Sequence, residues 1–368
     1  MQRRQFLQLA MASSALALSA LSGCSSRSSK ESPLLLSGAD KGNEHTVSGW
    51  QLGQGERFRL TVEQRVHAPL MRPGSHEAVY VARRPGTVIY VVDVKAGQIK
   101  QQVLAEKQRH FYGHAVFSND GRWLYVPENA YAEGGRGKLA VYDAAANYQR
   151  VQEFDLGGIG PHQLALMPDG LTLVVAMGGI QTHPDLDREK LNLATMQSAL
   201  VFVDRLSGKI TQRFDAPHQH LSLRHLDVAP DGTVVVGAQF QTAANPDQPY
   251  TGPLVFSQRG AEPLKAFEAQ ERDWLAQHHY IASVVINRAS TLALTTTPRG
   301  GRVNLWQLEQ GILLRSFPVR DVAGAGYLAD QNQFVVSNGL GQLFAVSDEL
   351  QLLAQAPATR WDNHLSIG

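Results

Sequence analysis

The sequence predicts an all-β protein, a seven-bladed β-propeller with four antiparallel strands in each blade. Three segments can be aligned: HAVFSNDGRWLYV from His114, HQLALMPDGLTLVV from His162 and HLDVAPDGTVVV from His225. Each reads as a short strand, an Asp-Gly turn and a second β-branched strand, which is a strong hairpin signal. His67, His114 and His162 follow one another at spacings of 47 and 48 residues (114 − 67 and 162 − 114), a period typical of propeller blades.

The remaining strands follow the hairpins in a regular order. The turns are Asp120-Gly121, Asp169-Gly170 and Asp231-Gly232. A third strand ends at an acidic residue in three units, at Asp93, Asp143 and Asp204, and a more polar fourth strand such as QIKQQVLA comes next. We expect the seven innermost strands to begin near His67, His114, His162, His225, Ser283, Gly324 and His364. Six or eight blades are the alternatives.

The last blade is expected to be shared between the two ends of the chain. Only HLSIG follows Asn363, which supplies one strand. Three further strands are available in PLLLSG, EHTVSGWQL and ERFRLTVEQ near the other end. Pairing these segments would close the ring without leaving an open strand edge. We therefore expect one propeller domain over residues 34–368, with short helices only near residues 185–197 and 268–278.

Composition excludes several classes of protein. The 34 Lys and Arg residues nearly balance 33 Asp and Glu residues, so no basic footprint for nucleic acid is expected. A single cysteine cannot form an internal disulfide, a Cys-rich zinc or iron–sulfur site, or a C-x-x-C-H haem attachment. The sequence also lacks a Walker loop, a G-x-S-x-G elbow and an H-E-x-x-H motif. Neither haem nor nucleotide is predicted.

The first residues read as an export signal. Arg3-Arg4-Gln5-Phe6-Leu7 resembles the twin-arginine motif, and Leu21-Ser22-Gly23-Cys24 resembles a bacterial lipobox. We expect residues 1–23 to be a signal peptide, Cys24 to carry lipid, and residues 24–33 to form a polar tether. The protein would then be lipid-anchored and face the periplasm, with Ser25 favouring the outer membrane over the inner. The alternative is an ordinary buried cysteine behind a Sec signal.

One residue type recurs at the first position of the innermost strand. His67, His114, His162, His225 and His364 occupy it in five blades that would be contiguous in the ring. Neutral imidazole is a common ligand of Zn, Cu and Fe, and rigid strands fix side chains well. We predict a metal site at the channel mouth. Glu128, Asn129, Arg224 and Asp362 are its possible accessory residues. The ring could instead supply a general base or bind an anion.

A structural role for these histidines is the main alternative. In WD-type propellers a Gly-His pair hydrogen-bonds to a turn aspartate, and Gly113-His114 fits that pattern with Asp93, Asp143 and Asp204 as candidate partners. Three long connections between second and third strands, residues 128–137, 178–198 and 241–252, would crowd the same mouth. Arg83, Arg84 and Arg299 also lie at ends of second strands and would face it, favouring an anion.

The leader together with GHAVFSNDGRWLYVPEN, GPHQLALMPDG and LRHLDVAPDG resembles the bacterial domain of unknown function 1513 family, of the quinoprotein amine dehydrogenase β-chain-like propellers. The resemblance covers residues 37–368 and implies a periplasmic role near metal acquisition, beside imelysin-type or di-haem proteins. It supplies no catalytic residues. The leading hypothesis is metal binding that assists iron or copper handling. The alternatives are a scaffold that docks partner lipoproteins or redox proteins, with the loops at 178–198 and 241–252 as the docking elements, and a metal-dependent oxidoreductase or hydrolase of unknown substrate.

Overall fold

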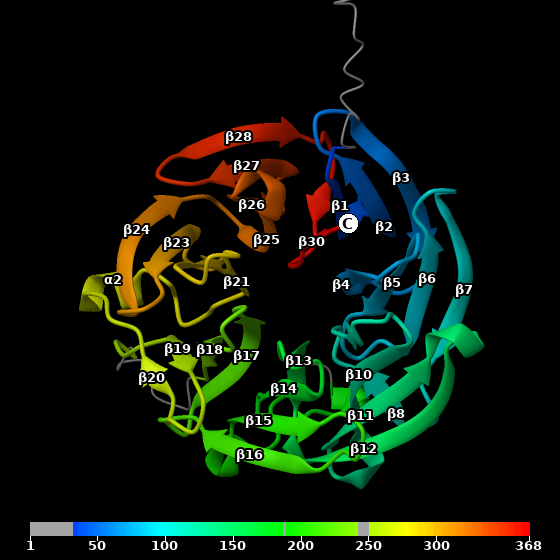
Figure 1. Cartoon of the computed structure of the whole chain (residues 1–368), viewed down its shortest axis with the longest axis horizontal. Coiled ribbons are helices and arrows are strands. Elements are labelled where there is room, and N and C mark those ends of the chain that lie inside the picture. Colours follow the sequence, from blue (N-terminus) through cyan, green and yellow to red (C-terminus); the bar gives the residue numbers. More distant parts are fainter. Residues whose placement is uncertain (1–31, 187–188, 242–249) are drawn as a thin grey trace, which may run out of the picture. The chain divides into compact units, whose positions relative to one another are not determined.

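Seven four-stranded antiparallel sheets form a ring in the computed structural model, which describes residues 32–186, 189–241 and 250–368 (Figure 1). The predicted seven-bladed propeller is confirmed. The ring belongs to the unit that spans Pro33–Gly368. The predicted signal peptide over residues 1–23 and the predicted lipidation site, Cys24, lie outside the described residues. Within the described part of the chain, no helix is long and apolar enough to cross a membrane.

The first four blades run in chain order, each from its inner to its outer strand. Blade 1 contains β4 (Val66–Met71), β5 (Glu77–Ala82), β6 (Val88–Asp93) and β7 (Gln98–Leu104). Blade 2 contains β8 (Arg109–Phe111) with β9 (Val116–Phe117), β10 (Trp123–Ala130), β11 (Arg136–Asp143) and β12 (Gln149–Ile159). Blade 3 contains β13 (Pro161–Leu166), β14 (Thr172–Met177), β15 (Ala199–Asp204) and β16 (Ile210–Asp215). Blade 4 contains β17 (Leu221–Val228), β18 (Val234–Phe240), β19 (Val255–Gln258) and β20 (Lys265–Ala266).

The last three blades complete the ring. Blade 5 contains β21 (Ser283–Ile286), β22 (Leu292–Thr297), β23 (Arg302–Gln307) and β24 (Ile312–Pro318). Blade 6 contains β25 (Val322–Leu328), β26 (Gln333–Asn338), β27 (Gln342–Val346) and β28 (Leu350–Gln355). Blade 7 contains β29 (Arg360–Trp361) with β30 (Ser366–Ile367), β1 (Leu34–Lys41), β2 (Glu44–Gln51) and β3 (Gly55–Val62).

The two chain ends share blade 7, as predicted. β1 pairs with β29 through Ala39 and Trp361, and with β30 through Leu35 and Ile367. The pairing joins residues more than 300 positions apart in the sequence. It gives the blade its innermost strand and leaves no unpaired edge at the junction.

Within residues 32–186, 189–241 and 250–368, helical structure is confined to single turns and one short helix. α2 covers Glu271–Leu275, within the predicted 268–278 segment. The 178–198 connection contains the 3₁₀ turns η3 (Pro184–Leu186) and η4 (Leu193–Thr195). The other turns are η1 (Tyr131–Glu133), η2 (Ala144–Ala146) and η5 (Ala329–Gln331). Most of the 241–252 connection, residues 242–249, lies outside the described residues.

The Asp-Gly turns have the conformation that the sequence requires. Gly121, Gly170 and Gly232 have φ angles of 67°, 66° and 84°, a region in which residues with a Cβ atom are disfavoured. Each aspartate also accepts hydrogen bonds from backbone N–H groups two or three residues further on. These local contacts fix the hairpin between the inner and second strands.

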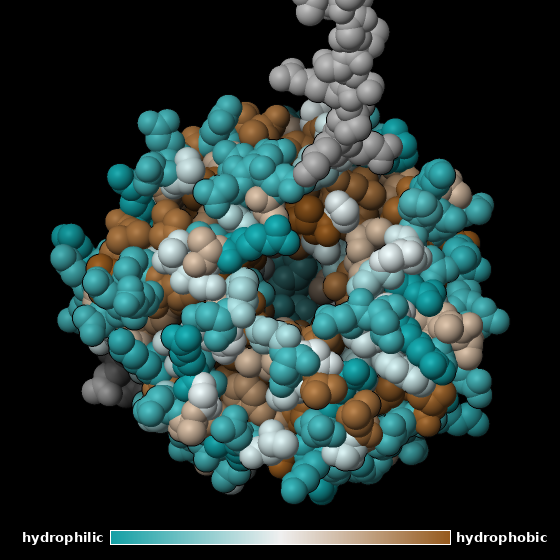
Figure 2. Space-filling view, viewed as in Figure 1, coloured by the Kyte–Doolittle hydropathy of each residue, from teal (hydrophilic) through white to brown (hydrophobic). Residues whose placement is uncertain are grey.

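Apolar side chains from adjacent blades form the core. One buried cluster joins Val79 and Val81 of β5 to Leu124 and Val126 of β10, packing blade 1 against blade 2. Further clusters connect the other blades in the same way. The packing therefore surrounds the axis rather than filling it, and Figure 2 shows the ring hollowed at its centre. The inner strands line that space.

Candidate metal centre

The five predicted histidines meet at the axis of the ring. Successive imidazole centroids lie 4.9 Å (His67–His114), 4.9 Å (His114–His162), 4.7 Å (His162–His225), 4.8 Å (His225–His364) and 4.4 Å (His364–His67) apart. The rings thus form a closed cluster, including the contact between His225 and His364 across the two blades that lack a histidine. None of the five is more than 9% exposed. We call these residues the histidine cluster.

Interrupted strand pairing accompanies every one of these histidines. His114 lies between β8 and β9, and His364 lies between β29 and β30, where pairing of the inner strand stops and resumes. Register shifts occur at the other three, between Val66 and Pro69, Pro161 and Leu164, and Leu223 and His225. Bulges of this kind re-aim side chains. Blade 6 has a similar shift, between Val322 and Gly324, without a histidine. The irregularity therefore does not depend on the presence of a histidine.

The potential ligand atoms lie close to one another. His67, His114 and His364 each offer a ring nitrogen within 4.8 Å of the others, and so do His114, His162 and His225. His114 belongs to both groups. The Nε2 atoms of His114, His225 and His364 are buried and have no hydrogen-bond partner in the described part of the chain. Buried polar atoms are nearly always paired, so these nitrogens indicate a missing partner at the centre of the cluster.

Neighbouring side chains fix which nitrogen faces the centre. His67 Nδ1 donates to Asp362 Oδ1 (3.3 Å), and His225 Nδ1 donates to Gln163 Oε1 (3.3 Å), because these oxygens can only accept. Ser283 Oγ donates to the Asn363 carbonyl and lies 3.4 Å from His364 Nδ1, from which it can accept. Such outer contacts orient metal-binding histidines and leave Nε2 as the free lone pair.

His162 is oriented differently. Its Nε2 accepts from Arg224 Nη1 at 3.5 Å, since a guanidinium has no acceptor atom. The Nδ1 atom of His162 is the buried one without a partner among the described residues. Because Nε2 accepts, the proton of the neutral His162 ring lies on Nδ1, and Arg224 competes with any ion for the lone pair of Nε2.

Burial keeps the imidazoles neutral. Desolvation is the largest influence on all five and lowers the pKa of each, well below the usual value for His114, His162, His225 and His364. For His67 the hydrogen bond to Asp362 acts in the opposite direction. Neutral imidazole is the metal-binding form, so the cluster is already in the protonation state that a metal ion requires.

Gly113 makes the close packing of two cluster members possible. Its φ angle is 94°, and a Cβ atom placed on it would lie 2.7 Å from Cβ of His67. Glycine alone tolerates both the conformation and the approach. The Gly113-His114 pair therefore supports the ring of His67 from the adjacent blade.

The structure does not support the hydrogen-bonded blade role for these histidines. Asp93, Asp143 and Asp204 accept from backbone N–H groups of their own turns, at Lys95, Ala145 and Ser207. Each aspartate thus caps the turn after the third strand. The histidine contacts described above involve Asp362, Gln163, Ser283 and Arg224 instead.

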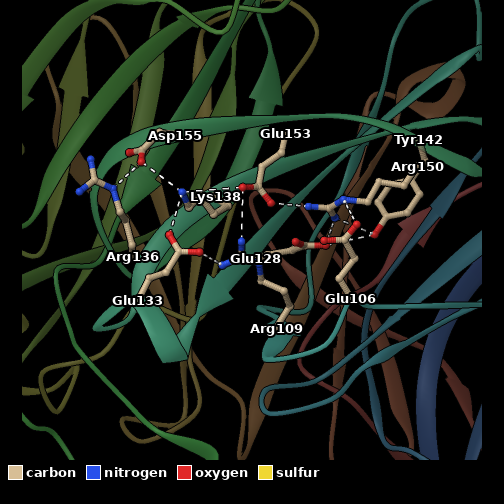
Figure 3. Close-up of polar contacts among 10 residues, drawn as sticks. All are labelled: Glu106, Arg109, Glu128, Glu133, Arg136, Lys138, Tyr142, Arg150, Glu153 and Asp155. Carbon is tan, nitrogen blue, oxygen red and sulfur yellow. Dashed lines mark hydrogen bonds and ion pairs between the residues drawn. The ribbon is translucent and has the colours of Figure 1, made fainter.

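Two of the four accessory residues reach the cluster, and two do not. Asp362 contacts His67, and Arg224 contacts His162. The Glu128 carboxylate instead binds Arg150 Nη1 (2.7 Å) and the Tyr142 hydroxyl (3.1 Å), within an ion-pair network on β10–β12 (Figure 3). Asn129 Nδ2 donates to His110 Nε2 (2.8 Å) and to the Thr182 carbonyl. Both residues lie in β10, opposite Phe111 and His110 of β8, and their side chains point to opposite faces of that strand.

A cavity of about 490 Å³ adjoins the cluster and contains His67 and His162 in its wall. Its lining comes from the starts of inner strands and the ends of second strands, as the loop analysis predicts. The five cationic side chains in this lining are Arg83, Arg84, Lys190, Arg224 and Arg299. Arg83, Arg84 and Arg299 were expected at this mouth, and Lys190 is contributed by the 178–198 connection.

Sequence reasoning missed the residues that orient the imidazoles. Gln163 and Ser283 contact His225 and His364 from neighbouring or distant blades, 62 and 81 positions away in the chain. Arg65 donates to Asp362 from a position 297 residues away. The only available signal was position: Gln163 follows a histidine, and Ser283 occupies the equivalent site in blade 5.

Residues 60–367 match the family described as "Protein of unknown function (DUF1513)". The chain belongs to the DUF1513 family. The match takes in all five cluster histidines, Asp362 and the cationic lining of the cavity. This DUF1513 protein has no match among curated protein sequences.

Among solved structures, the DUF1513 chain is similar to Kuenenia stuttgartiensis hydrazine synthase, with a TM-score of 0.64. The alignment covers 84% of this chain and 90% of that chain, at 14% sequence identity. At this identity the likeness shows the fold alone.

Proposed function

We propose that the histidine cluster binds a divalent first-row transition ion, Fe, Cu or Zn. The observation that carries the proposal is the set of buried Nε2 atoms on His114, His225 and His364 that have no partner among the residues the structure describes. Neutral imidazoles packed against one another, with Nδ1 of His225 held by Gln163 and Nδ1 of His364 beside Ser283, resemble a histidine metal site in which outer groups orient the ligands. An all-nitrogen donor set suits these ions better than Ca or Mg.

The spacing of the donors fits one ion after a small contraction. Two imidazole nitrogens bound to one tetrahedral ion at about 2.1 Å lie about 3.4 Å apart. The cluster nitrogens lie within 4.8 Å of one another in each group of three. The two groups share His114, so this histidine is the central ligand of either arrangement. In either arrangement, the two cluster histidines that do not bind the ion would lie next to it.

The cellular role that we propose is handling of iron or copper on the periplasmic side of a membrane. The support is the twin-arginine-like leader and the lipobox-like Cys24, together with a site that offers only imidazole nitrogen. A lipid at Cys24 would keep the propeller at the membrane surface, where imported metal first becomes available. Imelysin-type or di-haem periplasmic proteins are the partners we propose there.

Metal analysis tests the site directly. The exported protein would be compared with a His114→Gln/His225→Gln variant and with His76→Gln, which removes an exposed histidine. Metal-free samples of each would be loaded with Fe(II), Cu(II) or Zn(II), and metal content and thermal stability measured. We expect near-stoichiometric ion and a higher melting temperature in the wild type and His76→Gln, and neither in the double variant. Equal metal content in all three folded proteins would overturn the proposal.

A further inference from the structure

The cavity beside the histidine cluster concentrates positive charge. Arg83, Arg84, Lys190, Arg224 and Arg299 line it, and we call it the basic cavity. None of the described residues in its wall is Asp or Glu. The chain as a whole is nearly neutral, with 34 basic and 33 acidic residues. The local charge around this cavity is therefore far more positive than the charge of the chain as a whole, which is typical of a site that binds an anion.

These cations lie close enough to repel one another. Burial lowers the pKa of Lys190, and the charges of Arg224, Arg299 and Arg84 lower it further. Burial also lowers the pKa of Arg224 to about 10, with Arg84 and Arg299 acting in the same direction. Like charges in a partly enclosed space repel one another, and an anion bound among them would add attractive interactions that offset this repulsion.

Several residues of the cavity wall also carry buried polar atoms that lack a hydrogen bond to the described residues. Arg224 Nε, the Tyr112 hydroxyl, Thr182 Oγ1 and Gln241 Oε1 form no hydrogen bond within the described part of the chain. All four residues line the basic cavity. Three of these groups can donate to an oxygen atom, and an unpaired buried donor is costly. The charge and the unpaired donors thus point independently to an oxygen-rich ligand.

Size and wall chemistry narrow the class of anion. A volume of about 490 Å³ lies in the range of small-molecule sites and exceeds what a bare inorganic anion would fill. Tyr112, Tyr280 and Ile180 give the wall flat and apolar parts for a carbon skeleton. Arg299 is held over the Tyr280 ring, with Cζ 5.1 Å from the centroid. Guanidinium groups bind carboxylates through paired hydrogen bonds.

We propose that the basic cavity binds a small organic polycarboxylate with two or three negative charges, directly beside the histidine cluster. Binding of the anion itself does not require metal. The role of the anion beside His67 and His162 rests on the proposed function, because it assumes that the histidine cluster holds a metal ion. A polycarboxylate would accompany the ion into the site and supply oxygen ligands to it.

Calorimetric titration of the metal-free protein tests the anion site. The probes are tricarballylate, a tricarboxylate that lacks the hydroxyl group of strong chelators, inorganic phosphate, and the uncharged glycerol. We expect saturable binding of tricarballylate that weakens as salt is raised, much weaker binding of phosphate, and none of glycerol. Phosphate binding as tight as tricarballylate would overturn the polycarboxylate assignment, and no binding of either anion would overturn the site.

Variants connect the binding to the basic cavity. Arg299→Gln and Lys190→Gln should each weaken tricarballylate binding about tenfold, the loss expected for a hydrogen bond to a charged group. Arg315→Gln removes the same charge from β24, the outer strand of blade 5, and should change nothing. Equal affinities in all three variants would contradict the proposal. The His114→Gln/His225→Gln variant should keep tricarballylate binding, so failure of the metal site and failure of the anion site give different results.

Discussion

The carboxylate of Asp362 joins two residues from the opposite end of the chain: Oδ1 lies 3.3 Å from Nδ1 of His67, and Oδ2 accepts from Nε of Arg65 at 2.6 Å. Asp362 is buried, and its pKa lies well below the usual value because the contacts with His67 and Arg65 outweigh desolvation. The ionised carboxylate therefore fixes the proton of His67 on Nδ1. Blade 7 thus orients a histidine of blade 1.

Asp362→Asn should weaken metal binding without removing a ligand. The amide keeps the shape of the side chain but loses the charge that orients His67 and increases its basicity. Loss of such an outer contact typically lowers metal affinity about 10- to 100-fold. Competition with a chromogenic chelator would measure it. Asp348→Asn, at an exposed position, is the control, and equal affinities in the two variants would show that Asp362 has no such role.

Gly113→Ala should reduce metal binding by displacing His67. The new Cβ atom would lie 2.7 Å from Cβ of His67, and the φ of 94° adds backbone strain of about 1–3 kcal/mol. Gly53→Ala is matched to it, because Gly53 has a φ of 78° but no atom within 4 Å of the added Cβ. Both variants should lose stability in urea unfolding. Only Gly113→Ala should lose metal, and retention of metal there would refute the packing argument.

Acid should destabilise the propeller partly through His110, a histidine outside the cluster. Burial lowers the pKa of His110 to about 4 from an ordinary 6.5, and its Nε2 accepts from Asn129. The unfolded state therefore binds a proton that the folded state does not, and stability falls as the pH drops from 6.5 toward 4. The loss attributable to His110 is about 3 kcal/mol at pH 4.

Urea unfolding of wild type and His110→Gln between pH 7 and pH 4 would measure this contribution. The cluster histidines have shifts of the same sign, so both proteins should lose stability, the wild type more steeply. His76→Gln should parallel the wild type. Parallel curves for His110→Gln and wild type would show that His110 is not the group involved.

Arg150→Met should destabilise blade 2 and leave metal binding intact. It removes the ion-pair partner of Glu128, which is completely buried and whose pKa burial already raises (Figure 3). An uncompensated buried charge costs about 3–5 kcal/mol. The Glu128→Gln/Arg150→Met double variant should recover part of this loss in denaturant unfolding. A fall in metal content of the folded Arg150→Met protein would place Glu128 in the metal site after all.

Short-range patterns explain why the fold was predictable. The Asp-Gly turns at 120, 169 and 231 fix three hairpins through hydrogen bonds between residues two positions apart. Such contacts depend only on the local sequence. The repeat then places equivalent positions of successive blades at equivalent positions around the axis. For this reason the sequence alone places five histidines, spaced along the chain, at one mouth of the channel.

The accessory residues show where such reasoning ends. Glu128 and Asn129 lie at the end of a second strand, as Arg84 and Arg299 nearly do, yet their side chains enter blade 2. Their partners, Arg150 on β12 and His110 on β8, hold the two side chains away from the cluster, and a position at the end of a strand does not reveal such partners.

The sequence by itself determined the number of blades, the shared closing blade and the identity of the five histidines, because turns and periodicity act over short distances. Only the tertiary structure decided which nitrogen of each imidazole faces the axis, since Asp362, Gln163, Ser283 and Arg224 reach their histidines across blade boundaries. It also gathered five dispersed cations around one cavity. Closing the ring brings these groups together, and no local pattern in the chain encodes distances between blades.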